Sequence, residues 1–234
     1  MIVYGRNPVR EALRGPRAVE RVYGSESAGK LDWLASEQVE QRDELELREL
    51  CGSEEHQGVC AQVEAYHYAQ ATHLLEAEDA LVVALDEVQD PHNLGAVCRV
   101  AEAAGAAGVV ICERRAAAVT AAVCAASAGA VEHLALARVG NLADWLAQAK
   151  AAGAWVYGAS AQASVSYAQP DYSGRVVVVL GSEGRGLRPR VADSCDELIA
   201  LPQRGKVASL NVASAAAALV YGILQFRRAL DRAP

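Results

Sequence analysis

The chain has 234 residues, enough for one large domain or for a small and a medium-sized one, and 52% of them are hydrophobic, which suffices for a packed core. Its formal net charge of −7 argues against a uniformly basic nucleic-acid-binding protein, and its apolar runs are too short to span a membrane. The N-terminus lacks the apolar run of a secretory signal, and the six cysteines form no CxxC pair, so we expect a cytoplasmic protein with reduced thiols and no metal site.

The charges are unevenly distributed along the chain. From Ser173 to the end there are nine basic residues against five acidic ones, whereas acidic residues are in excess between Glu37 and Glu55. A local basic surface can hold phosphates even on an acidic protein. We expect the opening stretch to contribute to such a surface through Arg6, Arg10, Arg14 and Arg17.

Residues 1–66 are predicted to form a small α/β unit. The hydrophobic pattern favours helices over Arg6–Leu13 and Lys30–Val39 and strands over Val19–Tyr23 and Val59–Val63. Residues 67–78 show no clear period and are interpreted as a linker. The remaining part, residues 79–234, is predicted to be a second domain.

In this second domain short apolar runs alternate with helical patterns, which is typical of an open, mostly parallel sheet with helices on both faces. Ligands bind such sheets beyond the carboxyl ends of the strands, which indicates the loops after Leu85, Leu180 and Leu201. The predicted strands are Ala80–Leu85, Val109–Cys112, Leu134–Ala137, Trp155–Ala159, Val176–Leu180 and Leu198–Leu201. The predicted helices are Leu94–Ala104, Ala116–Ala126, Leu142–Ala151 and Leu210–Leu230.

The first of these loops turns at Asp90-Pro91 and is predicted to enter its helix near Asn93, acting as the N-cap. Arg99 lies off the apolar stripe of that helix. Its side chain either forms a surface pair with Glu102 or meets a phosphate or hydroxyl group beyond the strand ends.

The second loop, Gly181–Gly186, contains three glycines around Glu183. It is either a turn without a ligand or a place where backbone groups approach one, and the Glu183 carboxylate requires polar partners. The third loop carries two cations and leads into an Ala-rich helix, with Ser209 as the predicted N-cap and Asn211 in the first turn.

Three segments resemble, in order, the three motifs of the SpoU/TrmH family of RNA ribose 2′-O-methyltransferases, which belong to the SPOUT superfamily. They are Asp90-Pro91-His92-Asn93-Leu94-Gly95-Ala96-Val97-Cys98-Arg99, Leu180-Gly181-Ser182-Glu183-Gly184-Arg185-Gly186 and Leu201-Pro202 with Ser209-Leu210-Asn211-Val212. The segments Val3–Leu13 and His56–Val59 are similar to the L30e-like substrate-binding domain of the subgroup that methylates a guanosine of 23S rRNA.

The resemblance implies a knotted α/β fold with a trefoil knot, a homodimer, an RNA partner and S-adenosylmethionine as cofactor. The implied catalytic set is Asn93, Arg99, Glu183, Ser209 and Asn211, and the implied cofactor pocket comprises Ala159, Gly181, Glu183, Gly184, Leu201, Ser209 and Leu210. The sequence departs from many family members at Gln203, where they have Met.

In the family's proposed mechanism Arg99 is the base. Because a guanidinium stays protonated at neutral pH, we expect instead that Arg99 and Ser209 hold the target phosphate and polarise the ribose hydroxyl. Asn93, Asn211 and Glu183 would fix the loop geometry.

Two other functions remain open: a tRNA 2′-O-methyltransferase, and a non-catalytic RNA-binding or ribosome-assembly protein on the same fold. A Rossmann dehydrogenase is disfavoured because the first strand–helix turn lacks GxGxxG.

Overall fold

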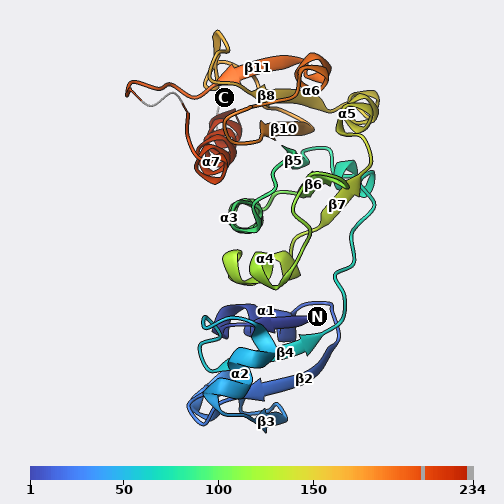
Figure 1. The fold of residues 1–234 in the computed structure, drawn as a ribbon. Helices are drawn as coiled ribbons and strands as arrows, with labels where there is room; N and C mark the ends of the chain where they lie inside the picture. Colours follow the sequence, from blue (N-terminus) through green and yellow to red (C-terminus); the bar gives the residue numbers. More distant parts are fainter. Residues whose placement is uncertain (207–208, 231–234) are drawn as a thin grey trace.

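The computed structural model describes residues 1–206 and 209–230, with side chains up to residue 227. Two α/β units lie end to end, the N-terminal one in blue and cyan in Figure 1 and the second in green to red. The predicted α/β class with a mostly parallel sheet is confirmed. No helix among the described residues is long and apolar enough to cross a membrane.

The N-terminal unit is a four-stranded sheet in the order β1-β4-β2-β3. β4 pairs antiparallel with β1 and with β2, and β2 pairs parallel with β3. Its elements are β1 (Ile2–Tyr4), α1 (Arg6–Arg14), β2 (Val19–Gly24), β3 (Val39–Gln41), α2 (Glu44–Cys51) and β4 (Val59–Val63).

The predicted helix over Lys30–Val39 is wrong. The chain forms two 3₁₀ turns there, Ala28–Lys30 and Asp32–Leu34, and then enters β3. Of residues 30–39 only Leu34 is buried, and a polar stretch follows it, so no apolar stripe extends beyond one turn. The helix of this region is α2 instead. It begins with a capping box: the Asp43 side chain accepts a hydrogen bond from the Glu46 backbone N–H, and the Glu46 side chain accepts one from the Asp43 backbone N–H.

The second unit contains a seven-stranded sheet in the order β7-β6-β5-β10-β8-β11-β9, and every described strand pair in it is parallel. Its strands are β5 (Leu81–Asp86), β6 (Gly108–Cys112), β7 (Leu136–Val139), β8 (Trp155–Ala159), β9 (Val165–Ser166), β10 (Val176–Gly181) and β11 (Glu197–Ala200). Its helices are α3 (Pro91–Ala103), α4 (Ala121–Ala126), α5 (Leu142–Ala151), α6 (Pro189–Ser194) and α7 (Val212–Leu230).

Helices cover both faces of this sheet, as the uninterrupted apolar strands predict. Along β5 the side chains alternate: Leu81, Val83 and Leu85 belong to the core that α3 and α7 cover, whereas Val82 and Ala84 belong to the core beneath α5. The apolar strands are therefore buried on both sides, and polar side chains gather at their ends.

Several predicted boundaries in this unit are shifted, and the sequence predicts neither of two short elements, β9 and α6. The helix predicted from Ala116 begins only at Ala121, and the strand predicted over Leu134–Ala137 lies at Leu136–Val139. A 3₁₀ turn over Ala130–Glu132 precedes that strand, and Leu134 is buried outside it. Periodicity does not distinguish a buried loop residue from a strand residue.

The two units are packed against each other through α4, which lies between the second sheet and the N-terminal sheet in Figure 1. Ala121 and Ala125 of α4 pack on the cluster that contains Tyr4 and Tyr23. Residues 67–78, predicted as a linker, also contact the second unit: Ala69 bridges to strand β7, and a 3₁₀ turn over His73–Leu75 buries Leu74 and Leu75.

The expected basic surface is smaller than the residue count indicates. Arg17 is buried and paired with Glu132, so its assignment to that surface is wrong. Among the basic residues after Ser173, Arg188 and Arg190 form ion pairs and Arg227 donates to three backbone carbonyls. Arg232 lies outside the described residues. Of the opening arginines, Arg6 and Arg14 are exposed.

Candidate active site

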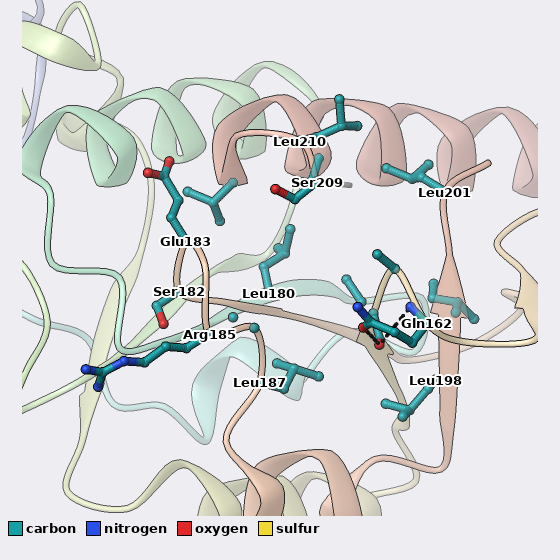
Figure 2. A pocket seen from close by; sticks show the side chains of 18 of the residues that line it. Gln162, Leu180, Ser182, Glu183, Arg185, Leu187, Leu198, Leu201, Ser209 and Leu210 are labelled. Atoms are coloured by element: carbon teal, nitrogen blue, oxygen red, sulfur yellow. Dashed lines mark hydrogen bonds between the residues drawn. The ribbon is translucent and has the colours of Figure 1, made fainter. Parts of the chain in front are cut away.

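A cavity of about 390 Å³ opens at the carboxyl ends of β8, β10 and β11. Its size falls in the range of ligand pockets, and its place agrees with the strand-end rule. Figure 2 shows leucines on several sides of it, among them Leu180, Leu187 and Leu198. All seven residues predicted to line a cofactor pocket are among its lining residues: Ala159, Gly181, Glu183, Gly184, Leu201, Ser209 and Leu210.

Three predicted site residues, far apart in the sequence, form a hydrogen-bonded triangle at this cavity. Glu183 Oε1 accepts from Asn93 Nδ2 at 2.9 Å and from Asn211 Nδ2 at 2.6 Å. Asn211 Nδ2 also donates to Asn93 Oδ1 at 2.8 Å. In Figure 2 the Glu183 side chain points towards α3 and α7, which carry the two amides. The partners that a carboxylate among glycines requires are therefore these two asparagines.

The helix ends that present the two asparagines differ from the predicted ones. α3 is capped by Asp90, whose Oδ1 accepts from the His92 backbone N–H, so Asn93 lies in the first turn and its amide is free to reach Glu183. At α7 the cap is Asn211 and not Ser209: Asn211 Oδ1 accepts from the N–H groups of Ala213 and Ser214. The Asn211 side chain thus caps its helix with the oxygen and joins the triangle with the nitrogen.

The glycine-rich loop after β10 requires its glycines. Gly184 and Gly186 have φ angles of +79° and +67°, which favour glycine. A Cβ at Gly181 would overlap the backbone of Gly186, because the loop folds back on itself there. This tight turn holds Glu183 beside the cavity, and in Figure 2 Arg185 points away from it.

The structure does not bring Arg99 to this cavity. Arg99 is exposed on α3, six residues or about 9 Å along the helix axis from Asn93. Neither Glu102 nor any other described residue forms an ion pair or hydrogen bond with it. Ser209 lines the cavity and is exposed. Of the five predicted catalytic residues, Glu183 and Ser209 therefore line the cavity, Asn93 and Asn211 are joined to Glu183 by hydrogen bonds, and Arg99 is separate.

Sequence reasoning missed a turn that lines the cavity and an ion pair outside it. The turn after β8, residues 160–162, lines the cavity beside Ala159. The signal for it was present, because the strand-end rule applied to the predicted Trp155–Ala159 strand indicates this turn. It also missed the ion pair between Asp86 and Arg188. A carboxylate at the end of an apolar strand was the signal, because a buried charge requires a partner. Gln203, the departure from the motif, lines the cavity as well.

The residues present fit S-adenosylmethionine. Leucine side chains offer apolar walls for a flat base, the glycine-rich turn offers backbone groups for polar atoms, and Glu183 supplies a negative charge for a cation. Among the described residues no His, Cys, Asp or Glu side chains are grouped closely enough to hold a metal ion.

The sequence matches two family profiles. The SpoU rRNA Methylase family profile matches residues 80–221, and the profile for RNA 2′-O ribose methyltransferase substrate binding matches residues 2–69. A Bacillus subtilis protein named as a TrmH family tRNA/rRNA methyltransferase, YacO, is 40% identical over 96% of this chain and 95% of its own length.

Solved structures agree with these profiles. The SpoU methyltransferase AviRb from Streptomyces viridochromogenes, in complex with AdoMet, superposes with a TM-score of 0.81 at 26% identity, over 97% of this chain and 90% of its own. An AdoMet-bound rRNA methyltransferase from Sinorhizobium meliloti gives a TM-score of 0.82 at 27% identity, over 98% and 87%. The chain therefore belongs to the SpoU/TrmH family of S-adenosylmethionine-dependent RNA 2′-O-ribose methyltransferases.

Proposed function

We propose that the protein methylates the 2′-hydroxyl of a guanosine in large-subunit (23S) rRNA. The choice of rRNA as the substrate is supported by the combination of two units. The Sinorhizobium meliloti rRNA methyltransferase aligns with 98% of the chain, so it shares both the substrate-binding and the catalytic unit. Guanosine rests on the resemblance of Val3–Leu13 and His56–Val59 to the subgroup that methylates it.

The bound cofactor supplies a methyl group on a positively charged sulfonium. The chain's own residues have to place the ribose hydroxyl, hold the neighbouring phosphate and exclude water. We assign the placing of the loops to the triangle of Asn93, Glu183 and Asn211, because its three hydrogen bonds join all three motif segments. Ser209, which lines the cavity, polarises the hydroxyl.

Arg99 is proposed to hold the target phosphate with its planar guanidinium. Within one chain Arg99 lies away from the cavity. Either the RNA extends from the cavity across the surface of α3 to Arg99 of the same chain, or Arg99 binds the phosphate of an RNA held in the cavity of a second chain. The second arrangement fits a homodimer in which each α3 faces the partner's active site. Leu210, just before α7, and Tyr221, in the middle of α7, are 49% and 48% exposed and provide apolar surface for such an interface.

Residues 1–66 are proposed to select the RNA, residues 67–78 to connect, and residues 79–234 to catalyse. The exposed Arg6 and Arg14 on α1 lie in the unit that matches the substrate-binding profile. Because this unit is packed on α4, it would hold the RNA at a fixed distance from the cavity. The trefoil knot that the family resemblance implies belongs to the same proposal, in the C-terminal part of the catalytic unit.

The experiment is to map ribose 2′-O-methyl groups in the rRNA and tRNA of cells that lack the gene and of cells that carry the wild type or Arg99→Ala. We expect one guanosine methylation of 23S rRNA to disappear with the gene and to return only with the wild type. Loss of a tRNA methylation instead would establish the tRNA alternative. An unchanged pattern in both RNAs would favour the non-catalytic role.

A further inference from the structure

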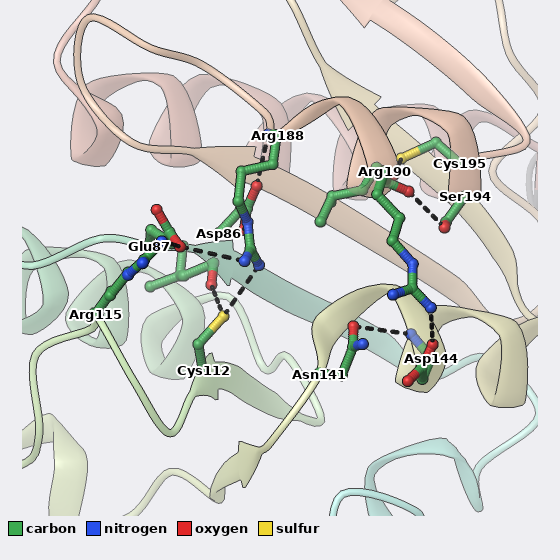
Figure 3. A network of polar contacts seen from close by, with 12 residues as sticks. Asp86, Glu87, Cys112, Arg115, Asn141, Asp144, Arg188, Arg190, Ser194 and Cys195 are labelled. Carbon is green, nitrogen blue, oxygen red and sulfur yellow. Dashed lines mark hydrogen bonds and ion pairs between the residues drawn. The ribbon is translucent and has the colours of Figure 1, made fainter.

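A network of charged side chains lies at the end of β5 (Figure 3), and its residues are not among those that line the cavity. At its centre is Asp86, whose side chain is fully buried. Arg188 meets this carboxylate three times: its backbone N–H donates to Oδ2 at 2.8 Å, Nε to Oδ1 at 2.7 Å, and Nη2 lies 2.6 Å from Oδ1. Asp86 thus depends on a single residue for its charged partner.

The same guanidinium also contacts Glu87 of the first loop and Cys112 at the end of β6. Nη1 of Arg188 lies 3.2 Å from Glu87 Oε1, and Nη2 donates to Cys112 Sγ at 3.7 Å. Glu87 has a φ of +56°, unfavourable for a residue with a side chain, and its partner Arg115 has the same φ. Ion pairs with Arg188 and Arg115 therefore hold a turn that the backbone alone disfavours.

The position of Arg188 in the chain lets this network connect two loops of the site. Arg188 lies two residues after the glycine-rich loop that carries Glu183 and is the residue before α6. Asp86 and Glu87 begin the loop that leads to Asp90 and Asn93. The network therefore connects the loop that leads to Asn93 with the loop that carries Glu183, the two residues that are hydrogen-bonded in the triangle.

We propose that Arg188 and Asp86 are positioning residues for methyl transfer, which hold the Glu183 loop and the Asn93 loop in the register that the cofactor cavity and the triangle require. Neither side chain lines the cavity, so both act through the residues that do. The Asp86 carboxylate raises the pKa of Arg188 through its hydrogen bonds while burial opposes this, so the guanidinium stays charged.

The choice of variant matters because Asp86 is buried. Removing Arg188 alone would leave an unpaired buried carboxylate, which endangers the fold. Replacing both partners by neutral residues of similar shape is far less damaging. The double variant Asp86→Asn/Arg188→Gln therefore removes both charges and the guanidinium fork and leaves a polar side chain at each position, and Arg188→Lys keeps a charge without the planar fork.

Arg190 provides a matched control two residues further along. It pairs with Asp144 at 2.6 Å, but both side chains are exposed, 71% and 55%, and neither belongs to the loops of the site. The two pairs are drawn together in Figure 3. Asp144→Asn/Arg190→Gln removes an ion pair of the same kind from the same helix region.

The experiment measures S-adenosylmethionine affinity by titration calorimetry, and kcat and the KM for RNA, on the full chain. We expect the Asp86/Arg188 double variant to weaken cofactor affinity and lower kcat by about 10- to 100-fold each, the effect of small misplacements at an active site. The KM for RNA should not change, Arg188→Lys should restore part of the loss, and the Arg190 control should match the wild type. If the double variant fails to fold, Arg188→Lys alone must show the same split.

Unchanged cofactor affinity and kcat in a folded variant would overturn the proposal, as would an equal loss in the Arg190 control. The inference rests on the proposed role of the triangle, and Glu183→Gln separates the two. If Glu183→Gln is fully active while the double variant is impaired, the role assigned to the triangle fails and the fastening of the cavity loop stands.

Discussion

Two polar clusters of the molecule use similar groups for different purposes. The Arg17–Glu132 pair lies between the two units with side chains 3% and 0% exposed, and Arg17 also donates to the Glu64 carbonyl and lies 5.5 Å from the Tyr66 ring. The triangle of Asn93, Glu183 and Asn211 lies at the cavity, and Glu183 and Asn211 are exposed. The buried cluster is satisfied entirely within the protein, whereas the exposed one faces the space that ligands enter.

The difference in burial indicates which property each cluster supports, stability or function. A buried ion pair with all its partners fixes the relative placement of the units, and its removal affects stability. An exposed cluster at a cavity contributes little to stability, and its removal affects binding and chemistry.

The largest expected effect is on stability. Arg17→Ala leaves Glu132 buried without its partner and should lower the free energy of unfolding by about 3–5 kcal/mol. Chemical denaturation measures this loss, and cofactor affinity of the fraction that remains folded should equal that of the wild type. Arg17→Met/Glu132→Leu should recover most of the stability, since it leaves no unpaired charge. A single variant as stable as the wild type would contradict this role.

Arg99→Ala is expected to lower activity and to leave stability unchanged. Loss of one charged donor to the transition state lowers kcat by about 10²- to 10³-fold. The melting temperature should stay unchanged, because Arg99 is exposed. Arg99→Lys should restore only part of the activity, since an ammonium lacks the planar fork.

Glu102→Gln is the control for a structural role of Arg99. It should leave methyl transfer at the wild-type level. Equal losses in both variants would show that a surface pair and not phosphate binding is responsible.

The same distinction explains what the sequence predicts well. Uninterrupted apolar strands such as Val176–Leu180 are visible in the sequence, and strand alternation brings their ends together, so Asn93, Glu183 and Asn211 could be assigned to one edge of the sheet. Buried ion pairs are different: Arg17 and Glu132 are 115 positions apart, and nothing local in the sequence distinguishes Arg17 from the exposed Arg14.

The N-terminal unit was predicted less well for a related reason. Its helix α2 has mostly polar residues and buries only Leu47, so its apolar stripe is weak. The signal that was present, the Asp43–Glu46 capping box, is a hydrogen-bond pattern and not a hydrophobic one. Likewise the caps at Asp90 and Asn211 depend on which of several polar residues in one turn bonds to the backbone, and side-chain type does not decide this.

Asn211 offers a smaller effect that separates the two contributions within one residue. Asn211→Ala removes the cap of α7 and should cost about 1 kcal/mol of stability, with a loss of methyl transfer from the broken triangle. Asn211→Asp keeps a capping oxygen but places a second carboxylate against Glu183, so stability should be nearly retained while activity is lost. Thermal unfolding and initial rates measure the two. Full activity of Asn211→Asp would show that the triangle is dispensable.

The smallest expected effect concerns the exposed edge of the contact between the units. Glu11 on α1 lies 3.0 Å from His133 Nε2 of the second unit and 2.8 Å from Arg10 Nε. Burial raises the pKa of Glu11, but the hydrogen bonds from His133 and Arg10 together with nearby positive charges lower it more, so the pKa in the folded protein lies below the ordinary value. Glu11 therefore stabilises the fold above the ordinary glutamate pKa of about 4.3, and this contribution is lost as the pH falls through the lowered value.

Glu11→Gln should accordingly cost about 0.5 kcal/mol near neutral pH, the size of a partly exposed ion pair. Unfolding midpoints of both proteins, measured from about pH 7 down to about pH 3.5, should converge as the glutamate of the wild type becomes protonated. Glu26→Gln, a change at an exposed glutamate of the same unit, should show no such convergence. A wild type less stable than Glu11→Gln near neutral pH, with a difference that again shrinks as the pH falls, would mean that the Glu11 pKa is raised in the folded protein. Glu11 would then oppose the contact between the units that Arg17 holds.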